Sequence, residues 1–323
     1  MSGGGRYRKI RRIGRGGMAE TFECVHELPS GVRERVCLKR ILPAYRNDPE
    51  IRRLFHEEGR LSSELLHPNV VRTLAQFEDE EGPGIVFELV DGVNLRELID
   101  ERKKRGGALP IDAVVHWLRQ ATLALDHAHR RRSATLSRGL VHRDITPSNL
   151  LVDPHGELKI ADFGIARPLD CTRREEHLVR GKLPYLAPEV RSGAGDDERS
   201  DLYALGVVAY ELITLRRPPL IQPQGGEGAV RSRPSETIER SDVPDVLRQL
   251  IDALLARDPD DRPPNARAVI DELESLPRLR PKTREWLAVL VARCLDERSS
   301  EEPLEKTEHL GQEITVRLDS RAS

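Results

Sequence analysis

The segment HRDITPSNLL, residues 142–151, contains two side chains at a spacing that suits catalysis. Asp144 and Asn149 lie in a short polar loop, and the apolar residues LLV follow them. A carboxylate can accept a proton, and a carboxamide oxygen can bind a hard cation. The pattern therefore indicates a general base and a metal ligand that face one phosphate group.

A second acidic residue follows an apolar, strand-like run. Asp162 comes directly after LKIA, in the segment ADFG of residues 161–164. Magnesium prefers oxygen ligands and is usually held by one or two carboxylates together with phosphates. Asp162 and Asn149 are therefore predicted to form a two-ligand magnesium site that bridges phosphate groups.

A glycine-rich segment and a lysine extend this phosphate chemistry. IGRGGMAETF, residues 13–22, lies between two strand-like runs, and its glycines allow backbone N–H groups to approach phosphate oxygens. Lys39 ends the run VCLK, where strand alternation puts it on the same face as Cys37. Glu57 and Glu58 are candidate ion-pair partners for this lysine. Taken alone, the glycines favour a plain hairpin, and Lys39 could equally be a surface residue.

The elements that would position these residues fall into two groups. Residues 7–41 and 84–90 have the alternation and turns of strands, and residues 49–66 form an amphipathic pattern that starts with proline. Helical patterns then dominate, over 95–105, 111–132, 199–215, 243–257 and 264–275. The sequence thus predicts an α+β protein with a small β-rich lobe, one helix in it, and a larger helical lobe. Residues 218–242 are predicted to form a long loop, and the polar chain beyond 296 to be disordered.

Composition limits the function classes. Of the 323 residues, 38% are hydrophobic and 33% charged, with a net charge of −2, which argues against a dedicated nucleic-acid-binding protein. The four cysteines form no CxxC pair, which fits a reducing cytoplasm better than a disulfide or zinc framework. The apolar runs are too short to span a bilayer, so no membrane association is expected.

The ordered set of motifs resembles that of eukaryotic-type protein kinases, and in particular the bacterial Hanks-type serine/threonine kinases. It comprises the glycine loop, VxxK, a helix glutamate, HPN, HRD, DFG, APE, DxxxxG and a late arginine, Arg262, a candidate partner for Glu189. The resemblance implies the bilobal protein kinase fold over 7–278. Its parts would be a small lobe at 7–89, a hinge at 88–92 and a large lobe at 93–278. Residues 1–6 would be a flexible start, and 279–323 a helix and polar tail.

The same resemblance implies roles for individual residues. Asp144 would accept the proton of a protein hydroxyl, and Lys39, oriented by Glu58, would hold the phosphates of ATP. Asn149 and Asp162 would bind Mg²⁺, with Mn²⁺ as a possible substitute. Residues 142–149 would be the catalytic loop, and Asp201 and Gly206 would belong to a helix that supports it. His142 and Phe163 would be packing residues. The implied nucleotide-binding residues are Ile13, Gly14, Arg15, Gly16, Gly17, Met18, Ala19, Thr21, Cys37, Lys39, Phe87, Glu88, Val90, Asn94 and Leu151.

Several positions depart from the family pattern. Ala19, Thr21 and Cys37 change the shape of the expected adenine pocket, and Ser62 stands where a larger apolar residue usually holds the Glu58 helix. Two further departures concern the catalytic loop. Thr146 stands where a lysine is usual, and Lys182 stands where a threonine is usual before APE. If these positions face each other across Asp144, Lys182 supplies the positive charge that the usual lysine would bring. Alternatively, Lys182 points to solvent and magnesium alone compensates the phosphate charge.

Two more segments carry expectations. Thr172 is the one candidate phosphorylation site between DFG and APE, and Glu175 or Glu176 could replace a phosphate by pairing with Arg143. KTREWLAVLVARCL, residues 282–295, has a helical apolar stripe that should pack on the larger lobe, with a partner-docking helix as the alternative. The polar tail after it is a candidate for autophosphorylation or partner recognition.

Two other functions remain open. A pseudokinase scaffold would bind ATP without catalysis, but such scaffolds commonly lose Lys39, Asp144 or Asp162, and all three are present. A small-molecule kinase usually lacks the APE segment and its late arginine, which are also present. The resemblance therefore favours an enzyme that uses ATP and protein substrates.

Overall fold

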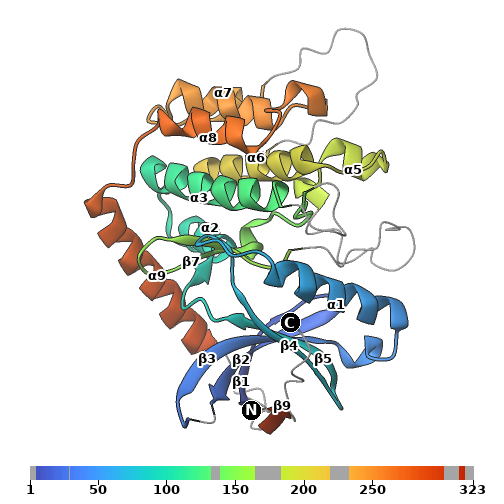
Figure 1. Ribbon diagram of the computed structural model, residues 1–323. Helices are drawn as coiled ribbons and strands as arrows, with labels where there is room; N and C mark the ends of the chain where they lie inside the picture. The colour runs from blue at the N-terminus through green and yellow to red at the C-terminus, as the bar shows by residue number, and fades with distance from the viewer. Residues whose placement is uncertain are drawn as a thin grey trace.

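The computed structural model describes residues 5–28, 30–131, 139–163, 183–218, 233–301 and 313–316. These residues form two lobes, a smaller one built on a sheet and a larger one built mainly of helices (Figure 1). Residues 89–92 connect the two lobes. This is the α+β, bilobal architecture that the sequence predicted.

The smaller lobe contains a six-stranded antiparallel sheet in the order β4-β5-β3-β2-β1-β9. Alternation along β3 separates its side chains as expected. Val36 and Leu38 are buried with one apolar cluster, whereas Cys37 packs against a second cluster on the opposite face. The strands are β1 (Gly5–Arg15), β2 (Ala19–Glu27), β3 (Arg33–Ile41), β4 (Thr73–Asp79), β5 (Gly82–Glu88) and β9 (Glu313–Val316).

One helix, α1 (Pro49–Ser63), packs against β4 and β5 on the face that carries Cys37 (Figure 1). Its start is well specified, because the Asp48 carboxylate accepts hydrogen bonds from the N–H groups of Glu50 and Ile51, and a proline at the first turn needs no partner. Its apolar face buries Phe55 against the sheet. This packing fixes the position of Glu58 relative to the sheet.

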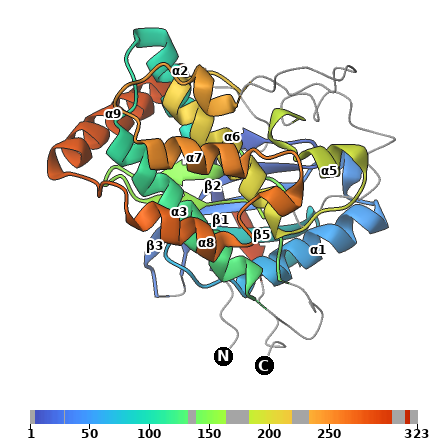
Figure 2. The same ribbon diagram turned by 90° about the horizontal axis from the view of Figure 1, so that it is seen from above.

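The larger lobe is organised around two buried helices, α3 (Ile111–His129) and α6 (Glu198–Thr214), which Figure 2 shows beneath α7 and α8. Residues 200–213 of α6 are all buried, because other elements surround this helix on every side. The other α-helices are α2 (Leu95–Arg105), α5 (Pro188–Ser192), α7 (Asp245–Leu254), α8 (Ala266–Glu274) and α9 (Pro281–Glu301). Short 3-10 turns occur at η1 (Pro43–Tyr45), η2 (Pro147–Asn149), η4 (Leu183–Tyr185), η5 (Pro234–Thr237) and η6 (Pro259–Asp261).

A second, three-stranded sheet lies in the larger lobe next to the connection between the lobes. Its order is β6 (Val93–Asn94), β7 (Leu150–Val152) and β8 (Leu158–Ile160). β7 follows the catalytic loop directly, and β8 leads into Asp162. The pairing of LLV with LKI therefore brings the loop that contains Asp144 next to the segment that contains Asp162.

The C-terminal region is more structured than its composition suggested. Helix α9 runs along one flank of the larger lobe toward the sheet (Figure 1), and its apolar stripe joins the core of that lobe through Leu287, Leu290 and Val291. This agrees with the expected packing of residues 282–295. The polar chain beyond 296 was expected to be disordered, yet α9 continues to Glu301, and EITV forms β9 on the open edge of β1. Edge strands offer unpaired backbone groups to such a segment.

None of the helices in the described ranges is both long enough and apolar enough to cross a membrane.

Candidate active site

Lys39 on β3 joins the two lobes through two ion pairs. Its Nζ lies 2.5 Å from Oε1 of Glu58 on α1 and 3.1 Å from Oδ1 of Asp162, which follows β8. Burial would lower the pKa of Lys39, but the carboxylates of Asp162 and Glu58 outweigh it and raise that pKa above its ordinary value. Lys39 is therefore held as a cation between the two lobes.

Of the two candidate glutamates, the structure selects one. The Glu58 side chain is buried and points to Lys39, whereas the Glu57 side chain is 40% exposed and pairs with Arg53 on the surface of α1. Two adjacent helix positions differ by about 100° in direction, so only one can face the sheet. The choice of Glu58 made from the family resemblance agrees with this contact.

The glycine-rich segment is the turn between β1 and β2. The N–H of Gly16 donates to the carbonyl of Ala19 at 2.8 Å and closes the turn. Gly14 lies opposite Thr21, and a Cβ on Gly14 would come within 2.6 Å of the threonine Oγ1. Thr21 in turn pairs with Lys39 across β2 and β3. The turn is thus a tight hairpin, as its composition alone suggested, and it lies next to the lysine.

The catalytic loop is held by its own hydrogen bonds. The Asn149 side-chain nitrogen donates to the Asp144 carbonyl at 2.8 Å, which leaves its Oδ1 as the atom that can bind a cation. The Asn149 carbonyl accepts from the N–H of Ala161 at 2.8 Å. This bond ties the loop to the residue directly before Asp162. Asp144 itself is 8% exposed.

His142 is held in this loop by both of its ring nitrogens and by the face of its ring. Its Nε2 donates to the Ala161 carbonyl at 3.2 Å, its Nδ1 accepts from the N–H of Asp144 at 3.1 Å, and its ring packs against Phe163 with centroids 4.4 Å apart. Burial lowers the pKa of His142, so the ring stays neutral. These contacts support the expectation that His142 and Phe163 are packing residues.

Asp201 on α6 supports the loop from below. Its carboxylate accepts from the N–H groups of His142 at 2.7 Å and Arg143 at 2.8 Å, and from His129 Nε2 at 2.8 Å. Burial would raise the pKa of Asp201, but the hydrogen bond from His129 and the neighbouring imidazoles hold it below its ordinary value. Arg143 has a φ of 67°, a costly conformation for a residue other than glycine. The bond from its N–H to Asp201 stabilises that conformation.

Several of the residues expected to bind the nucleotide come together in one apolar cluster. Ile41, Phe55, Val71, Ile85 and Phe87 form its buried part, and the residues packed against it include Ala19, Cys37, Val90 and Leu151. Burial raises the pKa of the Cys37 thiol to about 12, so this cysteine is an apolar wall and not a nucleophile. Five of the expected nucleotide-binding residues thus line one region between the lobes.

Side-chain contacts hold the residues on either side of the connection between the lobes. Oε1 of Glu88 accepts from the N–H of Arg72 at 2.9 Å and from Lys159 Nζ at 2.6 Å. Asn94 begins α2, and its Oδ1 accepts from the N–H of Glu97, whose carboxylate accepts from the N–H of Asn94 in return. This capping box uses the oxygen of Asn94 and leaves its amide nitrogen for a ligand.

Helix α1 is held to β4 by polar contacts at the position where a larger apolar residue was expected. Ser62 is 4% exposed, and its Oγ donates to the Gly59 carbonyl at 3.2 Å and accepts from Thr73 Oγ1 at 3.0 Å. A Cβ on Gly59 would come within 1.8 Å of the Gln76 side chain, so the helix lies close to the strand here. Thr73 was missed at the sequence level because nothing local links it to Ser62.

The remaining catalytic candidates are placed only in part. Thr146 is 5% exposed, and its Oγ1 has no hydrogen-bond partner among the residues that the structure describes. Lys182, Thr172, Glu175 and Glu176 lie outside the described residues. Arg143, the expected partner of those glutamates, places its Nε 2.5 Å from Asp196 Oδ2.

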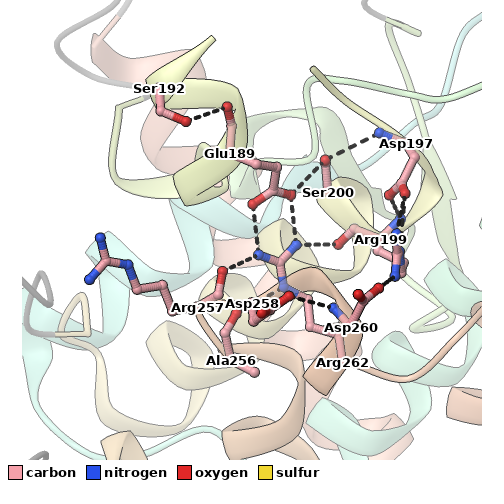
Figure 3. Close-up of polar contacts among 10 residues, drawn as sticks. All are labelled: Glu189, Ser192, Asp197, Arg199, Ser200, Ala256, Arg257, Asp258, Asp260 and Arg262. Atoms are coloured by element: carbon pink, nitrogen blue, oxygen red, sulfur yellow. Dashed lines mark hydrogen bonds and ion pairs between the residues drawn. The ribbon is translucent and has the colours of Figure 1, made fainter. Parts of the chain in front are cut away.

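Glu189 and Arg262 form the buried ion pair that the motifs suggested (Figure 3). Nη1 and Nη2 of Arg262 donate to the two carboxylate oxygens at 2.7 and 2.8 Å, and Ser200 Oγ adds a hydrogen bond to Oε1 at 2.9 Å. The Arg262 side chain is fully buried. Burial would raise the pKa of Glu189, but these hydrogen bonds hold it below its ordinary value.

A second buried network was missed at the sequence level. Glu211 on α6 is fully buried, and Arg96 on α2 donates to both of its oxygens at 2.8 and 2.9 Å. The hydroxyl of Tyr185 donates to Glu211 at 2.5 Å. Burial raises the pKa of Tyr185, so this hydroxyl remains a donor. Tyr185 thus packs as a structural residue, and no local sequence signal links it to Arg96.

Comparison with known proteins adds a family. Residues 7–272 match the family described as "Protein kinase domain". The chain is 32% identical over 279 residues to the tyrosine-protein kinase MasK of Myxococcus xanthus, a match that covers 84% of this chain and 43% of MasK. It is 34% identical over 266 residues to the serine/threonine-protein kinase PknA of Mycobacterium tuberculosis, covering 79% and 57% of the two chains.

A third relative and a solved structure agree with these matches. The chain is 34% identical over 264 residues to the serine/threonine-protein kinase PrkC of Bacillus subtilis, covering 79% of this chain and 38% of PrkC. The chain therefore spans between 38% and 57% of the length of these three relatives. The crystal structure of the PknI kinase domain of M. tuberculosis superposes with a TM-score of 0.60 at 27% identity, covering 83% of this chain and 95% of that one.

Proposed function

The chain belongs to the protein kinase family, and from this premise we propose that it transfers the γ-phosphoryl group of ATP to serine or threonine hydroxyls of proteins. The observation that carries the proposal is the position of Lys39, whose ammonium contacts both Glu58 and Asp162. A cation held between the lobes by two carboxylates is ready to meet phosphate oxygens, since its charge and position are fixed before the nucleotide binds.

The chemistry follows from positioning and charge. Asp144 accepts the proton of the substrate hydroxyl as that oxygen attacks the γ-phosphorus, and the bond to the β-phosphate oxygen breaks. Lys39 holds the α- and β-phosphates. The adenine ring lies in the apolar cluster beside Phe87 and Leu151, and Asn94 offers its amide nitrogen to the ribose.

Oxygen atoms that suit a hard cation lie between the lobes, near Lys39. Asp162 offers a carboxylate that is 42% exposed, and Asn149 offers its Oδ1, because its nitrogen is already bonded to Asp144. Within the described residues no group of three or more His, Cys, Asp or Glu side chains could hold a metal alone, so phosphates and water would complete the ligand set. These two residues would hold Mg²⁺, or Mn²⁺ in its place, and the ion would neutralise charge on the phosphates.

The buried hydroxyl of Thr146 supports the proposed exchange with Lys182. Thr146 Oγ1 has no partner among the described residues, and a buried hydroxyl without a partner costs about 1–3 kcal/mol. A hydrogen bond to the Lys182 ammonium or to the transferred phosphoryl group would remove this cost. Lys182 would then supply the positive charge that the catalytic loop lacks, from the opposite side of Asp144.

The nature of the acceptor rests on the relatives. PknA and PrkC are named serine/threonine-protein kinases, whereas MasK is named a tyrosine-protein kinase. We adopt the serine/threonine assignment, which the HPN segment at residues 67–69 also favours at the sequence level. Phosphoamino-acid analysis of a labelled generic acceptor separates the two, and phosphotyrosine as the main product would contradict the assignment.

The central experiment compares the wild-type chain with Asp144→Ala in phosphate transfer from ATP to a generic protein acceptor. Loss of a positioned base should lower turnover by on the order of 10² or more, while ATP binding persists. Lys182→Ala should lower turnover far more than ATP affinity. A wild-type chain that binds ATP but transfers no phosphate would instead support the pseudokinase alternative.

A further inference from the structure

Helix α9 lies outside the part of the chain that matches the family, yet it contacts the connection between the lobes. The family match ends at residue 272, whereas α9 covers Pro281–Glu301. Its start is held to α3, because Arg280, the residue directly before α9, donates to the Asp112 carboxylate through its N–H at 3.1 Å and its Nε at 3.0 Å. Its middle is buried through Leu287, Leu290 and Val291. The direction of its last turns is therefore determined by packing.

The last turns of α9 make ion pairs with α2. Arg293 Nη1 lies 3.1 Å from Oε1 of Glu101. Five residues further on, Arg298 contacts Glu97, with Nε at 2.9 Å from Oε1 and Nη2 at 2.6 and 2.8 Å from the two oxygens. Both arginines thus bind a glutamate of α2, but Glu97 lies in the first turn of that helix and Glu101 lies four residues further on.

Arg298 differs from Arg293 in that its partner, Glu97, also contacts a residue of the expected nucleotide site. The Glu97 carboxylate also accepts from the N–H of Asn94 at 2.8 Å, in the capping box that begins α2. Arg298 Nη2 reaches the Gly92 carbonyl as well, at 3.3 Å. Arg298 therefore contacts the connecting segment directly and Asn94 through one carboxylate.

The connecting segment has little freedom on its other side. A Cβ on Gly92 would lie 2.2 Å from the Val152 carbonyl, so the backbone of Gly92 runs directly against β7. Asn94 pairs with Leu151, which is part of the apolar cluster. The backbone at 92–94 is thus enclosed between β7 and the Arg298 guanidinium, and a small shift there would move both Asn94 and the adenine region.

We propose that Arg298 is a positioning residue for ATP: through Glu97 and the Gly92 carbonyl, it holds Asn94 and the connecting segment in the geometry that binds the nucleoside. The inference rests on the proposed function, because it assigns the nucleotide site to ATP. It makes α9 part of the working kinase unit, although α9 lies beyond the family match. An arginine suits this task because its planar fork can bind a carboxylate with two nitrogens and still reach a carbonyl.

The test uses Arg298→Gln in the full chain, with Arg293→Gln as the matched control. Both changes remove one guanidinium from α9 and its ion pair with α2. Glu101, the partner of Arg293, keeps Arg102 Nε at 3.0 Å and Arg105 Nε at 3.4 Å. We measure the Kd of Mg-ATP by calorimetry, the KM and kcat for ATP, and the unfolding temperature of each variant.

We expect Arg298→Gln to raise the Kd and KM for ATP about tenfold, the effect of losing one charge-assisted contact, with kcat within about twofold of wild type. Arg293→Gln should change the Kd less than about twofold at a similar unfolding temperature. Arg298→Lys should recover part of the affinity, because it keeps the charge but loses the fork.

Two results overturn the inference alone: ATP binding by Arg298→Gln at wild-type affinity, or an equal loss in Arg293→Gln. A wild-type chain that does not bind ATP overturns the proposed function together with the inference.

Discussion

The buried pair of Glu189 and Arg262 allows a stability change to be worked out before it is measured. All N–H groups of the Arg262 guanidinium have acceptors: Nη1 and Nη2 donate to the two Glu189 oxygens, and Nε, Nη1 and Nη2 donate to the backbone carbonyls of Ala256, Arg199 and Arg257 at 2.9, 3.0 and 3.2 Å (Figure 3). The perturbation is Glu189→Gln. It keeps the shape of the side chain and removes its charge.

The cost comes mainly from the charge that remains. In Glu189→Gln the amide oxygen can still accept from Nη1 and Ser200, but the amide nitrogen must face the N–H of Nη2. A fully buried guanidinium then has no counter-charge, and breaking a buried pair in this way costs about 3–5 kcal/mol. Since whole domains are stable by about 5–15 kcal/mol, the variant should lose a large part of the stability of the larger lobe.

The assay is urea unfolding followed by tryptophan fluorescence. The two tryptophans of the chain, Trp117 in α3 and Trp286 in α9, both lie in the larger lobe and report on its unfolding. Asp271→Asn is the matched control. It also changes a carboxylate to an amide in an arginine pair, but Asp271 and Arg267 are both 61% exposed, and exposed pairs contribute about 0–1 kcal/mol.

The dependence on pH gives a second check with a fixed sign. The pKa of Glu189 is lowered in the folded protein. Its stabilisation is therefore fully present above the unfolded value of about 4.3, and is lost as the pH falls through the lower folded value. The difference between wild type and Glu189→Gln should be constant near neutral pH and shrink below about pH 4. A loss no larger than that of Asp271→Asn at pH 7 would refute the reasoning, and so would a loss that persists unchanged in acid.

Further predictions concern the supports of the active site. Asp201→Asn removes the negative charge that accepts hydrogen bonds from two N–H groups of the loop and from His129. A hydrogen bond to a charged group contributes about 1.5–3 kcal/mol, so turnover should fall by about 10²-fold. The Kd of ATP should change little, and unchanged turnover would contradict this. Thr73→Val leaves the buried Ser62 hydroxyl without its donor, which should loosen α1 and lower turnover about tenfold. Ser63→Ala, at an exposed hydroxyl on the same helix, is its control and should have wild-type turnover.

The parts of the fold that the sequence could predict are those specified by short-range patterns. The helices expected at 95–105 and 199–215 occur at Leu95–Arg105 and Glu198–Thr214. Each has a capping residue at its start, and the second also contains a long apolar run, typical of a helix buried on all sides. β9 could not be predicted in the same way. Four residues, EITV, form a strand there only because the edge of β1 lies beside them in the folded protein. Their composition alone, within a polar tail, favours disorder.

The candidate site shows the same limit in its charged residues. The chain has 52 basic and 54 acidic residues, so a given arginine has many possible partners, and sequence separation does not rank them. Lys39 could be matched to Glu58 because the predicted helix offered only two adjacent glutamates, and the family resemblance chose the one that contacts the lysine. No motif made such a choice for Arg298 and Glu97. Their contact depends on α9 packing along the whole larger lobe, so its effect on Asn94 can be found only from the assembled fold.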